Sequence, residues 1–257
     1  MDWFFILFAA FIASGLTLFS GFGLGTILMP VVAIFFPIPV AVAITAIVHL
    51  LNNLFKLGFL WQHINKKVLI NFGLPALIAA IPGAVLLDYL SVLDPLASYS
   101  WLEQERVITP VKLAAGLLLI VFATAELFPV LGRITNHRAS ITLGGILSGF
   151  FGGLSGHQGA FRSAFLIKAG LGKEAFVATN AAIAALVDTS RIIVYGLTFD
   201  LLLIQSQSGL IGFTTLAAFL GVFIGTRFLK KVTIGFIQKL VAVMLYLLGG
   251  LLMIGMV

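Results

Sequence analysis

The sequence predicts an all-α integral membrane protein: an inverted-repeat bundle in which each half holds a broken or re-entrant helix hairpin plus three transmembrane helices. Three observations lead to this fold class. The composition is too apolar for a water-soluble domain, several apolar runs are long enough to cross a bilayer as helices, and the second half of the chain repeats features of the first. The two halves, residues 1–135 and 136–257, are expected to form one transmembrane domain.

The composition argues against a soluble fold. Of the 257 residues, 61% are hydrophobic and 9% are charged, whereas a soluble domain carries about 25% charged residues. The apolar runs are continuous rather than alternating, which excludes a transmembrane β-barrel. The chain has no cysteine, so disulfides, thiol nucleophiles and iron–sulfur clusters are excluded. The net charge of +6 is ascribed to loops that set the orientation in the membrane, and nucleic-acid binding is not predicted.

The breaks between apolar runs delimit the expected helices. The N-terminus lacks the basic segment of a cleaved signal peptide, so the first run is expected to remain as a helix. Two short runs follow glycine-rich breaks, and at about 1.5 Å per residue they are too short to cross comfortably, so each is interpreted as half of a re-entrant hairpin. Long helices are expected near residues 3–19, 40–61, 68–90, 109–131, 140–154, 173–197, 210–228 and 236–256, and the short runs end near 36 and 169.

The charges of the loops predict the orientation. One side collects most of the basic residues, namely Lys66, Lys67, Arg133, Arg138, Lys168, Lys173, Arg227, Lys230, Lys231 and Lys239. The other side holds Arg106 and Lys112 together with the acidic residues Asp94, Glu103, Glu105 and Asp200. Because basic loops stay in the cytoplasm, the first side is predicted to be cytoplasmic. We therefore expect a multi-pass protein of the cell (inner) membrane with both termini on the outer side.

The internal repeat appears at a constant offset of 135 residues. Ser20-Gly21 aligns with Ser155-Gly156, the segment 43–46 (Ala-Ile-Thr-Ala) aligns with 178–181 (Ala-Thr-Asn-Ala), and Asn53 aligns with Asp188. The long helix after the first break is expected to run from outside to inside, and its counterpart in the other direction. The halves are thus related by inversion, an architecture of secondary transporters whose sites form where broken helices meet near the midplane.

The glycine-rich segments resemble a known family signature. Residues 20–30 read Ser-Gly-Phe-Gly-Leu-Gly-Thr-Ile-Leu-Met-Pro and are followed by Ala43-Ile-Thr45; the pattern recurs as 152–156 (Gly-Gly-Leu-Ser-Gly) and 178–180 (Ala-Thr-Asn). The chain resembles the sulfite exporter TauE/SafE family over nearly its whole length. That resemblance implies an exporter of sulfite or small organosulfonates that is driven by an ion gradient.

Polar side chains inside the membrane are costly, so they are candidates for function. Thr45, His49, Asn53 and Lys56 recur at i, i+4, i+8 and i+11, which places them on one helix face. Asn180, Asp188 and Arg191 occupy the equivalent face in the second half. The two stripes are predicted to line a common cavity. The alternative is that such side chains only join helices, as Asn, Ser and Thr often do.

The glycine-rich breaks suit a small anionic substrate, since backbone N–H groups and a helix dipole can point at it. The predicted substrate-binding residues are Gly21, Gly23 and Gly25 at the first break, Thr45, His49 and Asn53 on the first stripe, Ser155, Gly156, His157, Gln158 and Arg162 at the second break, and Asn180. Arg162 is the preferred cation, because a guanidinium matches the oxygens of a sulfonate or carboxylate. Its alternative role is as a counter-ion in packing.

Three residues are candidates for coupling or for an ion pair. A histidine side chain has an ordinary pKa of about 6.5, so His49 could gain or lose a proton as the site alternates. Asp188 and Arg191 are three residues apart and can pair on one helix. A satisfied core histidine and a structural ion pair remain the alternatives.

Other functions are weighed against transport. Gly153-Leu-Ser155-Gly156 fits a motif of intramembrane serine proteases, but no histidine follows His157 to act as the base. The four histidines lack metal-ligand spacing, so neither a metal nor another cofactor is predicted, and the chain is not expected to be an enzyme. The sequence therefore predicts an alternating-access exporter of a small anion, with His49 and Asp188 as the candidates for coupling to protons. An importer, a membrane-embedded enzyme and an assembly factor are the alternatives, and the oligomeric state is left open, with a homodimer possible.

Overall fold

The computed structural model describes residues 2–20, 23–127, 139–199, 201–228 and 234–257. The expected repeat boundary at 135, Gly21, and the loop residues Arg133, Arg138, Asp200, Lys230 and Lys231 lie outside these ranges. In the first half the helices are α1 (Asp2–Ser20), α2 (Gly25–Ala33), α3 (Ile38–Leu60), α4 (Lys66–Val68), α5 (Leu74–Ser91) and α6 (Pro110–Leu127). In the second half they are α8 (Ala139–Ser155), α9 (Gly159–Leu166), α10 (Lys173–Thr198), α11 (Leu201–Gln205), α12 (Ser208–Phe228) and α13 (Ile234–Met253).

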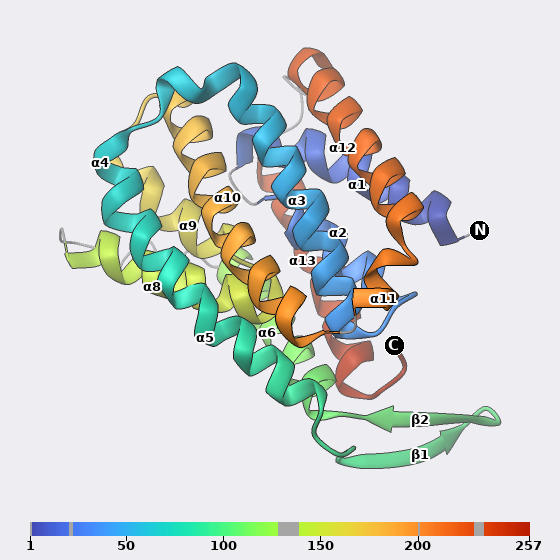
Figure 1. Cartoon of the computed structure of the whole chain (residues 1–257). Helices are drawn as coiled ribbons and strands as arrows, with labels where there is room; N and C mark the ends of the chain where they lie inside the picture. The colour runs from blue at the N-terminus through green and yellow to red at the C-terminus, as the bar shows by residue number, and fades with distance from the viewer. Residues whose placement is uncertain (1, 21–22, 128–138, 200, 229–233) are drawn as a thin grey trace.

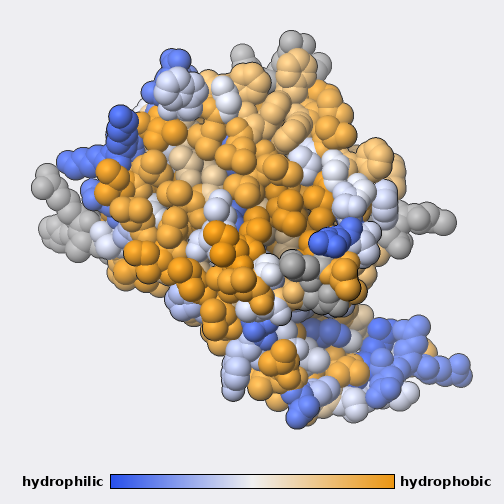
Figure 2. Space-filling model, in the orientation of Figure 1, coloured by the Kyte–Doolittle hydropathy of each residue, from blue (hydrophilic) through white to orange (hydrophobic). Residues whose placement is uncertain are grey.

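The protein is a multi-pass helical membrane protein. Four continuous helical segments of the described chain are long and apolar enough to cross a bilayer: Ile38–His63, Lys66–Ser91, Lys173–Thr198 and Ser208–Gly225. The first gains the short 3₁₀ segment Trp61–His63, and the second runs from α4 through a π-helical stretch, Leu69–Gly73, into α5. Apolar side chains cover most of the body, while hydrophilic residues gather at its ends (Figure 2).

The two glycine-rich segments break helices where the sequence predicts. α1 gives way to the short α2, and α8 gives way to the short α9. Gly23 and Gly156 have φ angles of 83° and 78°, in the left-handed region that a side chain would make unfavourable. The chain can therefore turn sharply at these two points, and α2 packs back on α1 as α9 packs back on α8.

The long helices pack in pairs that join the two halves of the chain. α3 packs on α10 at the centre, α5 on α8 and α1 on α12 at the two flanks, and α6 on α13 (Figure 1). Gly145, Gly149 and Gly153 form a stripe on α8 at four-residue spacing; a Cβ atom at any of them would collide with a backbone carbonyl of the segment 72–80. Small residues thus let the α5 and α8 backbones touch, as is typical of membrane helices.

The connection between α5 and α6, which carries Glu103 and Glu105, contains a β-hairpin that is not predicted from the sequence. β1 (Ala97–Trp101) pairs antiparallel with β2 (Gln104–Ile108), and Trp101 lies opposite Gln104. Leu102 and Glu103 form the two-residue turn with φ angles of 50° and 60°, the positive values that a type I′ turn needs. The usual Asn-Gly signal is absent, which is why sequence patterns missed it. The hairpin projects from the helical body (Figure 1).

Candidate functional site

A buried polar cluster lies between α3, α9 and α10, with Asp188 at its centre. The Asp188 carboxylate is fully buried and accepts hydrogen bonds from three side chains. They come from His49 Nδ1 on α3 at 2.7 Å, from Gln158 Nε2 beside the second break at 2.9 Å, and from Arg191 Nε and Nη2 at 3.0 and 2.8 Å. Asp188 therefore connects α3, α10 and the second break through hydrogen bonds.

Arg191 and Tyr195 attach α10 to the end of α8. Arg191 Nη1 donates to the Gly152 carbonyl at 3.2 Å, and the Tyr195 hydroxyl donates to the Gly153 carbonyl. Both carbonyls belong to the last turn of α8, and the Gly152 carbonyl also accepts from the Gly156 N–H at 3.0 Å. Tyr195 is not predicted from the sequence as part of the site, although it lies four residues after Arg191 and so on the same helix face.

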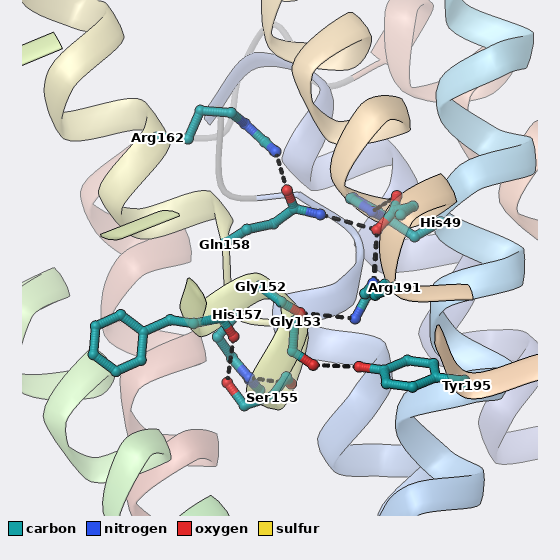
Figure 3. Close-up of polar contacts among 11 residues, drawn as sticks. His49, Gly152, Gly153, Ser155, His157, Gln158, Arg162, Arg191 and Tyr195 are labelled. Carbon is teal, nitrogen blue, oxygen red and sulfur yellow. Dashed lines mark hydrogen bonds and ion pairs between the residues drawn. The ribbon is translucent and has the colours of Figure 1, made fainter. Parts of the chain in front are cut away.

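Arg162 on α9 is held by neutral oxygens rather than by a carboxylate. Its Nε donates to Asn180 Oδ1, and its Nη1 donates to Gln158 Oε1 at 2.8 Å. The residue is 1% exposed. Across the described ranges, the salt bridges join Asp188 to Arg191 and to His49, and none reaches Arg162. Gln158 thus connects Arg162 to the Asp188 group. Figure 3 shows the Gln158 side chain between Arg162 and His49.

The cluster carries an excess of positive charge. Asp188 supplies one negative charge, whereas Arg162 and Arg191 supply two positive charges, so the sum is +1 with His49 neutral and higher with His49 protonated. A buried charge without a counter-charge costs several kcal/mol. The interior of this protein is therefore suited to a bound anion.

The first break meets this cluster at Gly23. A Cβ atom on Gly23 would lie 3.1 Å from His49 Nε2 and 3.6 Å from Arg162 Nη2. A Cβ atom on Gly25 would lie 3.3 Å from the Gly156 carbonyl of the second break and 3.6 Å from Thr45 Cγ2. The two breaks therefore meet in the interior, and the absence of side chains on Gly23 and Gly25 allows that approach.

Two residues of the predicted stripe on α3, Thr45 and His49, reach this junction, and polar atoms of the stripe lack a hydrogen-bond partner. Thr45 Oγ1, His49 Nε2 and Asn53 Nδ2 are buried and have no hydrogen-bond partner among the described residues. The first turn of α2 begins at Gly25, and no side chain caps it. The backbone N–H groups of Thr26, Ile27 and Leu28 donate to the carbonyls of Gly23 and Leu24, so this end of α2 contributes the positive end of its dipole to the junction. Such a set of groups suits an oxyanion.

Other predicted residues lie elsewhere or have structural contacts. Ser155 Oγ donates to the Phe151 carbonyl of its own helix at 3.1 Å. His157 stacks on Phe122, with ring centroids 5.5 Å apart, and its Nδ1 lies 2.8 Å from the Ser155 carbonyl rather than the Ser155 hydroxyl. Gly156 packs against Arg191.

Some polar residues beside the stripes do join helices, as the alternative interpretation held. Asn52 accepts a hydrogen bond from Ser14 of α1 at 3.0 Å, and Ser190 donates to the Leu77 carbonyl of α5 at 3.0 Å. Lys56, the last residue of the first stripe, is buried. Within the parts of the chain that the structure describes, no group of three or more His, Asp or Glu side chains could hold a metal ion.

Helices long enough to cross a bilayer and broken helices that meet in the interior are features of secondary transporters. The chain belongs to the sulfite exporter TauE/SafE family, whose model matches residues 6–252. The family is one of membrane transporters that export sulfite or related anions. No curated protein gives a significant sequence match to the chain.

Proposed function

We propose that this protein exports a small anion, with sulfite or an organosulfonate as the first candidates, and that the anion binds where the two helix breaks meet. The observation that carries the proposal is Arg162, a buried guanidinium held by Asn180 and Gln158, with no salt bridge to a carboxylate in the described chain. A monoanion beside Arg162 would neutralise the excess charge of the cluster and form charge-assisted hydrogen bonds.

The proposed pocket lies around Gly23. Arg162 would supply the main positive charge, and His49 Nε2 and Thr45 Oγ1 would contact the oxygens of the anion. The positive end of the α2 dipole would add a potential that favours the anion. Gln158 and Asn180 would orient the Arg162 guanidinium, and Asp188 would do the same for His49.

Alternating access by two inverted halves is part of the proposal. If residues 1–135 and 136–257 are structural repeats, α1 corresponds to α8, α3 to α10, α5 to α12 and α6 to α13. Under this correspondence, the contact of α1 with α12 has its counterpart in the contact of α8 with α5. The contacts of α3 with α10 and of α6 with α13 each join a helix to its own counterpart. Both kinds of contact support a twofold relation between the halves. Rocking of one half against the other would then open the junction to either side.

Export is favoured over import by membership of the exporter family. His49 and Asp188 are the proposed groups for coupling to protons, because they are in contact inside the cluster. A membrane-embedded enzyme has less support, since His157 contacts the Ser155 carbonyl and not its hydroxyl. A pure assembly role would leave the buried charge excess unexplained.

Efflux from proteoliposomes tests the proposal. Vesicles loaded with radiolabelled sulfite should lose it through the wild-type protein, and Arg162→Gln should reduce the rate at least about tenfold, because a charge-assisted contact is removed. Arg106→Gln is the matched control: Arg106 is on the hairpin and donates to the Met256 carbonyl, so sulfite efflux should be unchanged. Wild-type efflux no faster than in empty vesicles, or full activity of Arg162→Gln, would contradict the assignment.

A further inference from the structure

The hydrogen bond between His49 and Asp188 fixes which nitrogen of the imidazole carries a proton. His49 Nδ1 lies 2.7 Å from Asp188 Oδ2. Gln158 Nε2 and two nitrogens of Arg191 also donate to this carboxylate, so it acts as an acceptor only. The proton of a neutral His49 therefore lies on Nδ1, and Nε2 presents a lone pair.

That lone pair points into the proposed anion pocket. His49 is 1% exposed, and its Nε2 has no hydrogen-bond partner among the described residues. Gly23 separates it from the Arg162 guanidinium, since a Cβ atom on Gly23 would touch both groups. The proposed anion site thus contains one acceptor next to its main positive charge.

An acceptor in an anion pocket discriminates between oxyanions. A sulfonate has three oxygens that only accept, so one of them would face the lone pair of Nε2 without a proton between them. An oxyanion that keeps one acidic hydroxyl can donate a hydrogen bond from it to Nε2 and direct its charged oxygens at Arg162. A buried acceptor that is left without a donor is unfavourable, so the difference is sufficient for about tenfold selection.

We propose that the site selects monoprotonated oxyanions, such as hydrogen sulfite, over sulfonates, and that His49 Nε2 accepts a hydrogen bond from the hydroxyl of the substrate. This rests on the anion site proposed above and chooses between its two candidate substrates. The proton crosses the membrane as part of the anion, with no bond to the central atom made or broken. The charged groups that face His49 are Asp188 and Arg191 on α10 and Arg162 on α9; the described part of α2 contributes none.

The test is a pair of anions with the same shape and charge that differ by one proton. Near neutral pH, methylphosphonate is chiefly a monoanion that carries one hydroxyl, and methanesulfonate is a monoanion without one. Calorimetric titration of the full-length protein in detergent should give a Kd for methylphosphonate about tenfold below that for methanesulfonate. His49→Phe, which removes the acceptor, should bring the ratio of the two Kd values close to one. His63→Phe, on the exposed turn after α3, should keep the wild-type ratio.

Each outcome separates the two proposals. Equal Kd values in the wild type, or tighter binding of methanesulfonate, would overturn the selection by His49 while leaving the anion site in place. Failure of both anions and of sulfite to bind would overturn the anion site as well. The wild-type ratio decides the question even if His49→Phe does not fold. A His49→Phe protein that folds and keeps the tenfold preference would overturn the role of His49, because another group would then accept the hydrogen bond from the hydroxyl.

Discussion

At the scale of single residues, the function proposed here depends on a charge that the protein itself does not balance. Arg162 is surrounded by side chains that could have been acidic with almost no change in shape. Asn180 is the clearest case, because its Oδ1 accepts from Arg162 Nε. An aspartate there would complete a salt bridge.

Asn180→Asp is therefore expected to affect binding and stability in opposite directions. The new carboxylate would neutralise Arg162 and compete with the anion, so the Kd for sulfite should rise at least about tenfold, while Tm should hold or increase. Asn180→Ala retains the excess charge and should bind sulfite more tightly than Asn180→Asp does. Titration calorimetry and thermal unfolding measure the two effects. Normal sulfite binding by Asn180→Asp would mean that the uncompensated charge does not hold the anion.

Most polar residues of the site could be predicted from the sequence, because His, Asn, Asp and Arg are rare within apolar transmembrane segments. Their contacts could not. His49 and Asp188 are 139 positions apart and meet only because α3 packs on α10. The spacing likewise could not show that Ser155 and His157 point to backbone carbonyls, since a break between helices has no fixed periodicity.

At the scale of helices, the bundle depends on close backbone contact between α5 and α8. Gly149 lies in the middle of the α8 glycine stripe, and a Cβ atom there would collide with the Ala76 carbonyl. Backbone cannot move aside as a flexible side chain can. The pairing also holds the second break, because α8 ends at Ser155.

Gly149→Ala is expected to lower the stability by about 1–3 kcal/mol through overpacking. The fall should be visible as a lower Tm and a smaller monodisperse fraction after purification in detergent. Gly58→Ala on α3 is the matched control, because a Cβ atom at Gly58 meets nothing within 4 Å. If both variants unfold at the wild-type temperature, α5 and α8 are not as closely packed as described.

Helix positions were largely predictable, since long apolar runs and glycine breaks are strong local signals. The β-hairpin was not, because Leu102 and Glu103 adopt positive φ angles without the glycine or asparagine that normally announces such a turn. Tertiary contacts accompany it: the Tyr99 hydroxyl donates to the Ile254 carbonyl at 2.6 Å, and Arg106 Nη1 donates to the Met256 carbonyl at 3.1 Å. These partners are remote in sequence.

At the scale of the whole molecule, the distribution of loop charge predicts which end faces the cytoplasm. The hairpin and the basic turn at α4 lie at different ends of the body (Figure 1). Leu102, at the tip of the hairpin, is 81% exposed, and Lys67 is also exposed. The native chain has no cysteine, so a single introduced thiol can be labelled without background.

Leu102→Cys in intact cells should react with a membrane-impermeant maleimide, whereas Lys67→Cys should react only after the membrane is permeabilised. The reason is that basic loops are retained in the cytoplasm. Labelling can be read as a mass shift on a gel, with the cysteine-free parent as control. The reverse pattern would invert the orientation and place both termini inside.

The excess charge of the buried cluster also decides which step of a transport cycle would respond to voltage. With one monoanion bound beside Arg162, the loaded site would be electrically neutral, and its reorientation would not depend on the membrane potential. The empty site would carry about one positive charge, and a negative cell interior would draw it back to the inward-facing state with up to ~2.3 kcal/mol per 100 mV. The membrane potential would then favour export by acting on the return of the empty carrier, in addition to any coupling to protons.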